Sequence, residues 1–270
     1  MLTVRALSIS VRLAAGQDIR VLGPTCCSRK FVDMPTSAHL EFNRRRNFVA
    51  REQETVTIES LRVAHAARRK EIRARMREFG QVWETASDAR LWEEMVYCIF
   101  TAGASAKMGL RSVEAIRPLL GKGNQRAMTH ALVAAGAHRF PNARPIYVVT
   151  TRDYLQGSFS MKLRERLKSF SDPFERRDWL ATEPRIKGLG YKEASHYLRN
   201  IGFKGYSILD KHILRCLAEL GVIDSPKPPT NRDRYLETER RMRQFAAEVR
   251  IDFDELDLVL WSIKTGEILK

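Results

Sequence analysis

The sequence has few cysteines and no long apolar run, and both absences restrict what the chain can be. Its four cysteines, at positions 26, 27, 98 and 216, include no C-x-x-C pair, and none has a histidine at zinc-ligand spacing. We therefore expect reduced thiols, no disulfide framework and no metal site. No apolar stretch approaches the roughly 18–20 residues of a membrane span. These absences predict a soluble intracellular protein, cytoplasmic and nucleoid-associated if its source is prokaryotic, and no membrane partner.

Acidic residues are scarce relative to basic ones. The 270 residues include 47 lysines and arginines against 32 aspartates and glutamates, which gives a formal charge of +15. Such an excess does not bear on the fold, but it favours a polyanionic partner such as nucleic acid or an anionic membrane surface. The hydrophobic content of 44% is ordinary for a globular protein, so a sizeable core is expected as well.

Residues 1–45 form a basic N-terminal extension. Up to Phe31 they contain a single acid, Asp18, against five arginines and lysines. This composition is typical of an organellar presequence, and equally of a stretch translated upstream of a later start codon at Met34. We favour the second interpretation and keep a presequence in residues 1–31 as the alternative. Poor order is predicted for residues 1–45, and a helical region for residues 46–270.

Alternation with period two, which is typical of strands, is also missing. Helical patterns separated by short loops with glycine or proline occur at residues 56–80, 91–100, 113–120, 128–135, 146–155 and 161–170. They predict an all-α fold. The first pattern carries a dense basic face between Arg62 and Arg77, an arrangement that is most often only a solvated face, and its contribution to DNA binding stays open.

The most informative stretch begins at Asp172, which is placed to cap a helix that ends before Pro184. A tight turn follows, Gly188-Leu189-Gly190, in which we expect the leucine to point inward. A second helix then runs to Gly202. Backbone N–H groups of the turn and of the second helix's first residues are suited to bind a DNA phosphate. A G-x-G turn alone is weak support, because many helix–helix turns contain glycine.

Two residues at helix starts have the chemistry of a glycosidic cleavage. Lys192 lies in the first turn of the second helix, and Asp210 begins the next one. An attacking amine must be neutral, whereas an ordinary lysine is neutral in roughly one molecule in two thousand at pH 7. The helix dipole, neighbouring cations and partial burial would each favour the neutral form of Lys192. The carboxylate of Asp210 would stabilise an oxocarbenium-like sugar, although taken alone it is more simply explained as a helix cap.

These residues resemble the hairpin, lysine and aspartate of the helix-hairpin-helix base-excision DNA glycosylase superfamily. The resemblance is stronger to its second-type, archaeal-type 8-oxoguanine DNA glycosylase/lyase branch. That branch has a run similar to residues 188–200 and another similar to residues 209–215. Further similarity lies at residues 91–106, at residues 138–144 and in the tail from Leu256 to Lys270.

The resemblance implies a two-part all-α fold whose lesion pocket lies in the cleft between the parts. It implies that Lys192 attacks C1′ of the damaged nucleoside, expels the base and forms a Schiff base that permits β-elimination. Asp210 would stabilise the sugar cation and assist proton transfer. Gly188, Leu189 and Gly190 would form the phosphate-binding hairpin. The expected partner is double-stranded DNA that contains 8-oxoguanine.

For base recognition the resemblance points to three residues. Lys270 would reach into the pocket and help to distinguish 8-oxoguanine from guanine. Trp261 would stack on the extruded base, with core packing as the alternative, and Tyr147 is a weaker candidate for the opposite face. The absence of cysteine after Cys216 predicts no iron–sulfur cluster. No cofactor is expected, and we expect a monomer.

Two rival functions remain open from sequence. One is a glycosylase of the same superfamily for another lesion, such as an oxidised pyrimidine or a mispaired adenine; similarity around Lys270 speaks against it. The other is a non-catalytic DNA-binding protein that keeps the hairpin for phosphate contact alone. Retention of both Lys192 and Asp210 argues against that role, because a pure binder needs neither.

Overall fold

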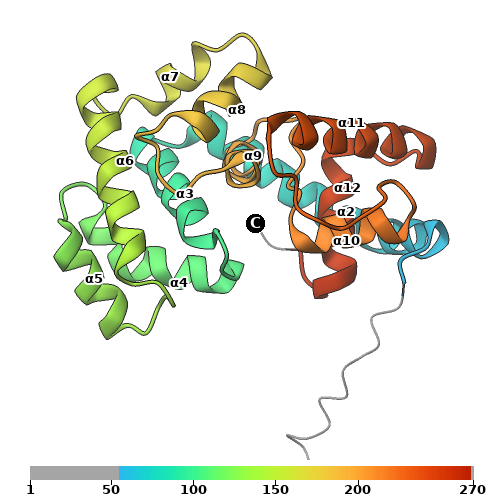
Figure 1. Ribbon diagram of the computed structural model, residues 1–270, viewed down its shortest axis with the longest axis horizontal. Coiled ribbons are helices and arrows are strands. Elements are labelled where there is room, and N and C mark those ends of the chain that lie inside the picture. The colour runs from blue at the N-terminus through green and yellow to red at the C-terminus, as the bar shows by residue number, and fades with distance from the viewer. Residues whose placement is uncertain (1–54, 269–270) are drawn as a thin grey trace, which may run out of the picture. The chain divides into compact units, whose positions relative to one another are not determined.

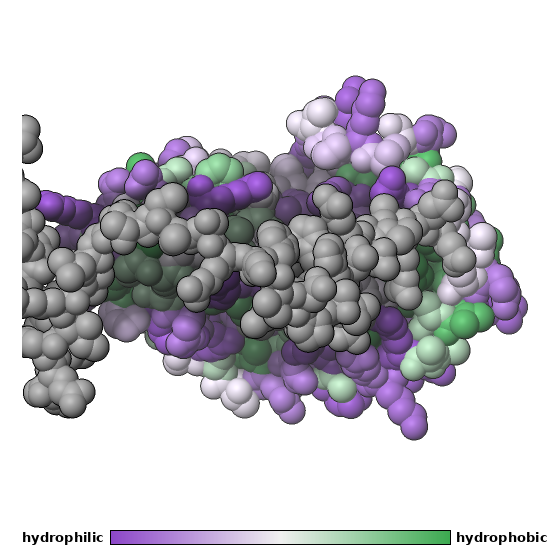
Figure 2. Space-filling model, turned by 90° about the horizontal axis from the view of Figure 1, so that it is seen from below, coloured by the Kyte–Doolittle hydropathy of each residue, from purple (hydrophilic) through white to green (hydrophobic). Residues whose placement is uncertain are grey.

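The computed structural model describes residues 55–268, which form helices joined by loops, with no strand in that range (Figure 1). The predicted all-α fold is therefore what the structure shows. The extension 1–45 and Lys270 lie outside the described residues, and the boundary at residue 46 stays a prediction. No helix within residues 55–268 is long and apolar enough to cross a membrane. In Figure 2, hydrophilic side chains form most of the visible rim, with small hydrophobic patches between them.

A first hydrophobic core is built around helix α3, which is buried almost all round between Leu91 and Thr101 because nearly every position there is apolar. The helices that contribute to this core are α3 (Asp88–Thr101), α4 (Ala106–Ile116), α5 (Gln125–Ala134), α6 (Ala143–Phe159), α7 (Leu163–Lys168), α8 (Pro173–Thr182) and α9 (Tyr191–Asn200).

A second hydrophobic core lies among helices α2, α10, α11 and α12 and contains residues such as Ile213, Met242 and Leu260. These helices are α2 (Ile58–Thr85), α10 (Lys211–Glu219), α11 (Arg232–Val249) and α12 (Phe253–Thr265). In Figure 1, α3 to α8 stand on one side, α10 to α12 on the other, and α9 lies between them. The fold therefore has the two parts that the family resemblance implies.

Two buried ion pairs join the parts. The guanidinium of Arg177 on α8 contacts the carboxylate of Glu239 on α11, and the arginine side chain has no exposed surface. Arg199 on α9 pairs with Asp257 on α12 at 3.0 Å. Both pairs exclude water almost completely, so these charges are compensated mainly across the boundary between the two cores. Glu239 has a second, more distant partner in Arg243, at 3.7 Å on its own helix.

Helix starts follow the capping residues in the sequence. Asp172 caps α8 through a bond from the Phe174 N–H at 2.8 Å, and Pro173 occupies the first helical position, as predicted. The helix ends at Thr182, before Pro184. Gly202, with φ +97°, follows the C-cap of α9, because this left-handed conformation suits glycine.

The predicted segments differ from the structure in their bounds; helix α2, for example, continues past Gly80 to Thr85. The helix expected at residues 113–120 starts at Ala106, because Ser105 caps it, and ends in a 3₁₀ turn over Arg117–Leu119. Gly109 does not interrupt it; a Cβ there would meet Thr101 Cγ2 at 2.6 Å, so glycine lets α4 pack closely on α3. Helix α6 begins before Pro145, which the first turn tolerates. Helix α7 is shorter than residues 161–170 at both ends.

Candidate active site

The hairpin between α8 and α9 has the predicted geometry. Gly188 adopts φ +81°, and Leu189 points into the first core with 5% of its surface exposed. Gly190 is the N-cap of α9, and no side chain bonds the first turn of that helix. The first N–H groups of α9 are therefore left for an external acceptor, such as a phosphate oxygen.

A cleft of about 1150 Å³ lies in front of this hairpin and is lined by residues from both cores. Helix α9 contributes Lys192, the start of α10 contributes Asp210, and α12 contributes Trp261. Residues 103–107, which run from a loop into the start of α4, and loop residues 228–231 also line the cleft. The structure thus brings together the predicted lysine, aspartate and tryptophan, which are far apart in sequence.

Lys192 occupies the second position of α9, and 31% of its side chain is exposed. Its position at a helix start and its partial burial agree with the sequence prediction. Its ion-pair partner is a carboxylate, since Glu193 Oε1 lies 2.8 Å from Lys192 Nζ, and the sequence did not predict this contact.

Asp210 is the N-cap of α10, which confirms the simpler of its two predicted roles. Its Oδ1 accepts the backbone N–H groups of His212 at 2.8 Å and of Ile213 at 2.9 Å. These bonds fix the carboxylate on the wall of the cleft. Both bonds use one oxygen, so the other is not engaged by these two N–H groups. Helix capping and charge stabilisation are therefore compatible for this residue.

The three predicted base-recognition residues differ in position. Trp261 lines the cleft and is half-buried. Tyr147 does not line it; the tyrosine ring packs beside Gly188, beneath the Arg144 guanidinium at 5.4 Å. Lys270 lies outside the described residues. The structure therefore brings Trp261 to the site and leaves Tyr147 next to the hairpin.

Burial changes the titration of two further residues in the cleft wall. It raises the pKa of the Asp257 carboxyl to about 6, although the neighbouring Arg199 counteracts this shift. Burial also lowers the pKa of His212, which favours the neutral form of its imidazole. Sequence reasoning assigned no role to Asp257, His212 or Glu193. All three lie in the sequence runs that resemble the glycosylase branch, and this location was the sequence feature that could have pointed to them.

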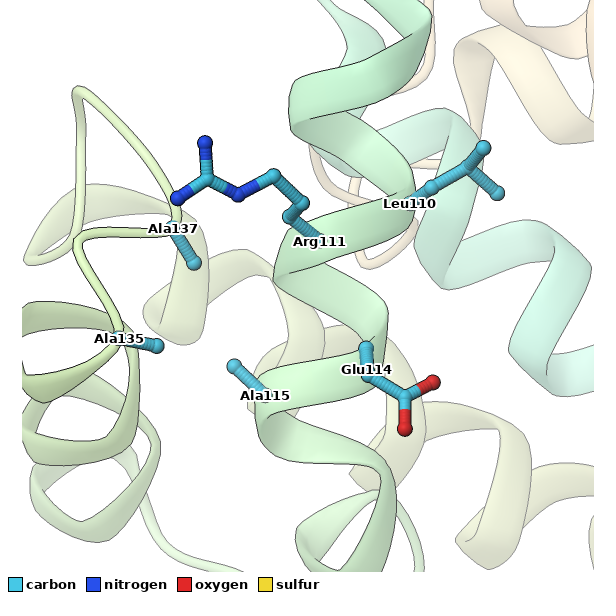
Figure 3. Close-up of a pocket in the computed structure, with 6 residues that line it drawn as sticks. All are labelled: Leu110, Arg111, Glu114, Ala115, Ala135 and Ala137. Carbon is cyan, nitrogen blue, oxygen red and sulfur yellow. The ribbon is translucent and has the colours of Figure 1, made fainter.

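A second hollow, of about 410 Å³, lies on α4 away from these residues. Figure 3 shows Ala115 of α4 facing Ala135 and Ala137, with Arg111 extending toward the same loop. Its lining is mostly apolar and includes none of the predicted site residues. The large cleft is therefore the candidate active site.

Comparison with known proteins identifies the family of this chain. The family model for 8-oxoguanine DNA glycosylase matches residues 72–251. A Korarchaeum cryptofilum 8-oxoguanine DNA glycosylase/AP lyase is 39% identical over 199 residues, which cover 74% of this chain and 90% of the relative. The corresponding Fusobacterium nucleatum protein is 33% identical over 199 residues, covering 73% and 89%.

Solved structures show the same similarity. The Methanocaldococcus jannaschii 8-oxoguanine glycosylase/lyase in complex with a 15mer DNA containing 8-oxoguanine superposes with a TM-score of 0.71 at 32% identity. The match covers 79% of this chain and 99% of that one. The 8-oxoguanine DNA glycosylase of Thermotoga maritima gives a TM-score of 0.70 at 31% identity, covering 79% and 98%. This chain belongs to the 8-oxoguanine DNA glycosylase family.

Proposed function

We propose that this chain excises 8-oxoguanine from double-stranded DNA and cleaves the resulting abasic site by β-elimination. The observation that carries the proposal is the meeting of Lys192 and Asp210 at two helix starts in one cleft. An amine nucleophile opposite a fixed carboxylate is what cleavage of a glycosidic bond through a covalent intermediate requires.

In the proposed reaction the lone pair of the neutral Lys192 amine forms a bond to C1′. The bond between C1′ and the base nitrogen breaks, and its electron pair leaves with the base, which takes up a proton. Transfer of a proton from the lysine nitrogen to the ring oxygen breaks the bond between C1′ and that oxygen, which opens the sugar ring and gives the protonated Schiff base. The C2′ hydrogens of that iminium are acidic, so removal of one expels the 3′ phosphate.

Asp210 would act by its charge. The sugar becomes cationic as the base departs, and a carboxylate that is already held by two N–H groups needs no reorganisation to stabilise it. The same pair of bonds restricts the carboxylate to one orientation on the cleft wall. The position of the Asp210 carboxylate, rather than its basicity, supports its role in stabilising the sugar cation.

Base recognition would involve Trp261, Lys270 and, less directly, Tyr147. A half-buried indole on the cleft wall offers a flat face on which an extruded purine can stack. Lys270 would read the edge at C8 and N7, where guanine and 8-oxoguanine differ. Lys270→Ala should therefore reduce excision of 8-oxoguanine more than cleavage of a preformed abasic site. An equal loss of activity on both substrates would show that Lys270 is not part of the lesion pocket.

The direct test of the proposed function is borohydride trapping. A duplex that contains 8-oxoguanine should become covalently attached to the wild-type chain, and Lys192→Gln should abolish the adduct while duplex binding is retained. Lys187→Gln is the matched control, because this lysine is exposed on the same hairpin but precedes the helix. Trapping by K192Q would place the nucleophile elsewhere. Failure of the wild-type chain to form an adduct despite binding DNA would favour a non-catalytic binding protein.

A further inference from the structure

The Lys192 ammonium must lose a proton before its nitrogen can attack C1′, so the proposed reaction needs a proton acceptor. An ordinary lysine has a pKa of about 10.4 and is almost entirely an ammonium ion at pH 7. A proton acceptor must lie within hydrogen-bond reach of the ammonium, directly or through one water.

Glu193 is the group that meets this requirement. Its Oε1 lies 2.8 Å from Lys192 Nζ, and its side chain is only 13% exposed. The glutamate is the third residue of α9, so it comes from the same rigid turn as the lysine. The pair is therefore already assembled without DNA.

The other carboxylates in the cleft wall are engaged elsewhere. Asp210 holds the backbone of α10, Asp257 pairs with Arg199 at 3.0 Å, and Glu267 pairs with Lys107 at 2.7 Å. Within the described residues, the ion pair of Lys192 is with Glu193 and not with Asp210. The remaining titratable or cationic groups of the lining come from the loop after helix α5, from α9, α10 and α11, and comprise Arg139, Tyr191, His196, Lys211, His212 and Tyr235.

We propose that Glu193 accepts the proton of Lys192 and so generates the attacking amine. This inference rests on the proposed function. In the step, one N–H bond of the ammonium breaks, its proton moves to Glu193 Oε1, and the freed lone pair forms the bond to C1′. The pair changes from ammonium and carboxylate to amine and carboxylic acid with no change in net charge, and no external reactant is needed.

Binding of DNA would favour this transfer for two physical reasons. Filling the cleft removes water from the ion pair, and desolvation disfavours charged forms relative to neutral ones. In addition, Glu193 Oε2 lies 3.5 Å from where a Cβ at Gly190 would stand, so the carboxylate extends back to the phosphate-binding turn. A phosphate seated on that turn would repel the carboxylate charge and raise its affinity for a proton. Substrate binding and activation of the nucleophile would thus be coupled.

The test is the pH dependence of borohydride trapping on a duplex with a preformed abasic site, under single-turnover conditions from pH 6 to pH 10. This substrate needs the amine but no base recognition. Glu193→Gln keeps the size of the side chain at the third helix position. Its trapping rate at pH 7 should fall about 10²-fold or more, and the rate should recover as rising pH deprotonates the lysine. Glu193→Asp should give an intermediate rate, since it retains a carboxylate.

Glu237→Gln is the matched control, because this glutamate pairs with Arg240 and Arg241 on α11 and does not line the cleft. It should trap like the wild-type chain. An unchanged rate and pH profile in E193Q would overturn the inference, and so would faster trapping at low pH, which would make Glu193 a partner that keeps the lysine protonated. A wild-type chain that is not trapped at all would refute the proposed function itself and this inference with it.

Discussion

Replacing Gly188 by alanine tests whether the hairpin depends on its backbone conformation. Gly188 has φ +81°, a left-handed conformation that costs an L-residue about 1–2 kcal/mol. The added Cβ would also lie 2.9 Å from Tyr147 Cδ2 and 3.3 Å from Ile99 Cγ2. Ile99 is fully buried in the first core, so the displaced side chains have little room to move.

The size of the effect follows from these two terms. Overpacking of a filled site costs about 1–3 kcal/mol. Together with the backbone term of about 1–2 kcal/mol, Gly188→Ala should lower the free energy of unfolding by about 2–5 kcal/mol. At about 2–4 °C per kcal/mol for a chain of roughly this length, that corresponds to a fall in Tm of about 4–20 °C.

Gly190→Ala provides the internal comparison. This residue has φ −98°, which alanine adopts readily, and an added Cβ would only touch Glu193 Oε2 at 3.5 Å. Its stability loss should stay below about 1 kcal/mol, since alanine is merely a weaker N-cap than glycine. Gly190 is exposed at the N-terminus of α9, where a DNA phosphate would bind. The methyl group of alanine should therefore weaken binding to undamaged duplex.

Urea unfolding followed by tryptophan fluorescence, together with duplex binding at fixed salt, separates the two effects. Equal stability losses in the two variants would refute the reasoning, because they would mean that φ at residue 188 is not the determining factor. A loss below about 0.5 kcal/mol in G188A would do the same.

Three further predictions concern charge. Asp210→Asn keeps an oxygen that can cap α10, so stability should change by less than about 0.5 kcal/mol while excision falls about 10²-fold or more; near wild-type excision would leave Asp210 a purely structural cap. Binding to undamaged duplex should weaken steeply with salt, by about 0.9 in the slope of log K against log salt for each phosphate contacted, whereas a flat response would mean that the charge of +15 is not directed at DNA. Burial holds the pKa of Asp257 near 6, above its unfolded value of about 3.9, so its contribution to stability is full below the unfolded value and is lost as the pH rises through about 6. The stability difference between the wild-type chain and Asp257→Asn, measured by urea unfolding, should therefore change between about pH 4 and about pH 7 and be constant above; a constant difference throughout would contradict this titration.

Local rules were sufficient to predict the helices that begin with a clear cap. Asp172 and Asp210 have side chains that bond their own helices, so both starts could be inferred from neighbouring residues. Helix α11 was not predicted at all. It is rich in charge, and its buried face of residues such as Tyr235 and Met242 is visible only once α12 and the second core are in place.

The candidate site was predictable where a residue's role depends on its own helix, and less so where it depends on contacts from elsewhere. Lys192 could be placed at a helix start because Gly190 ends the turn before it. That its charged neighbour is Glu193 depends on side-chain rotamers, which no sequence pattern specifies. Tyr147 shows the same limit, because whether its ring reaches the cleft or the hairpin is decided by the path of α6 past Gly188.

The buried ion pair between Arg177 and Glu239 constrains how this sequence can diverge. Losing Glu239 alone leaves the Arg177 charge uncompensated inside the protein, at a cost of about 3–5 kcal/mol, which is a large part of a typical domain's stability. Losing Arg177 alone leaves Glu239 with the more distant Arg243, at 3.7 Å. Replacing both by apolar residues of similar volume is often neutral or favourable. A chain with the charged pair and a chain with two apolar residues are therefore separated by single mutants of low stability. Evolution by one substitution at a time should rarely convert one into the other. Related chains should accordingly carry both charges or neither.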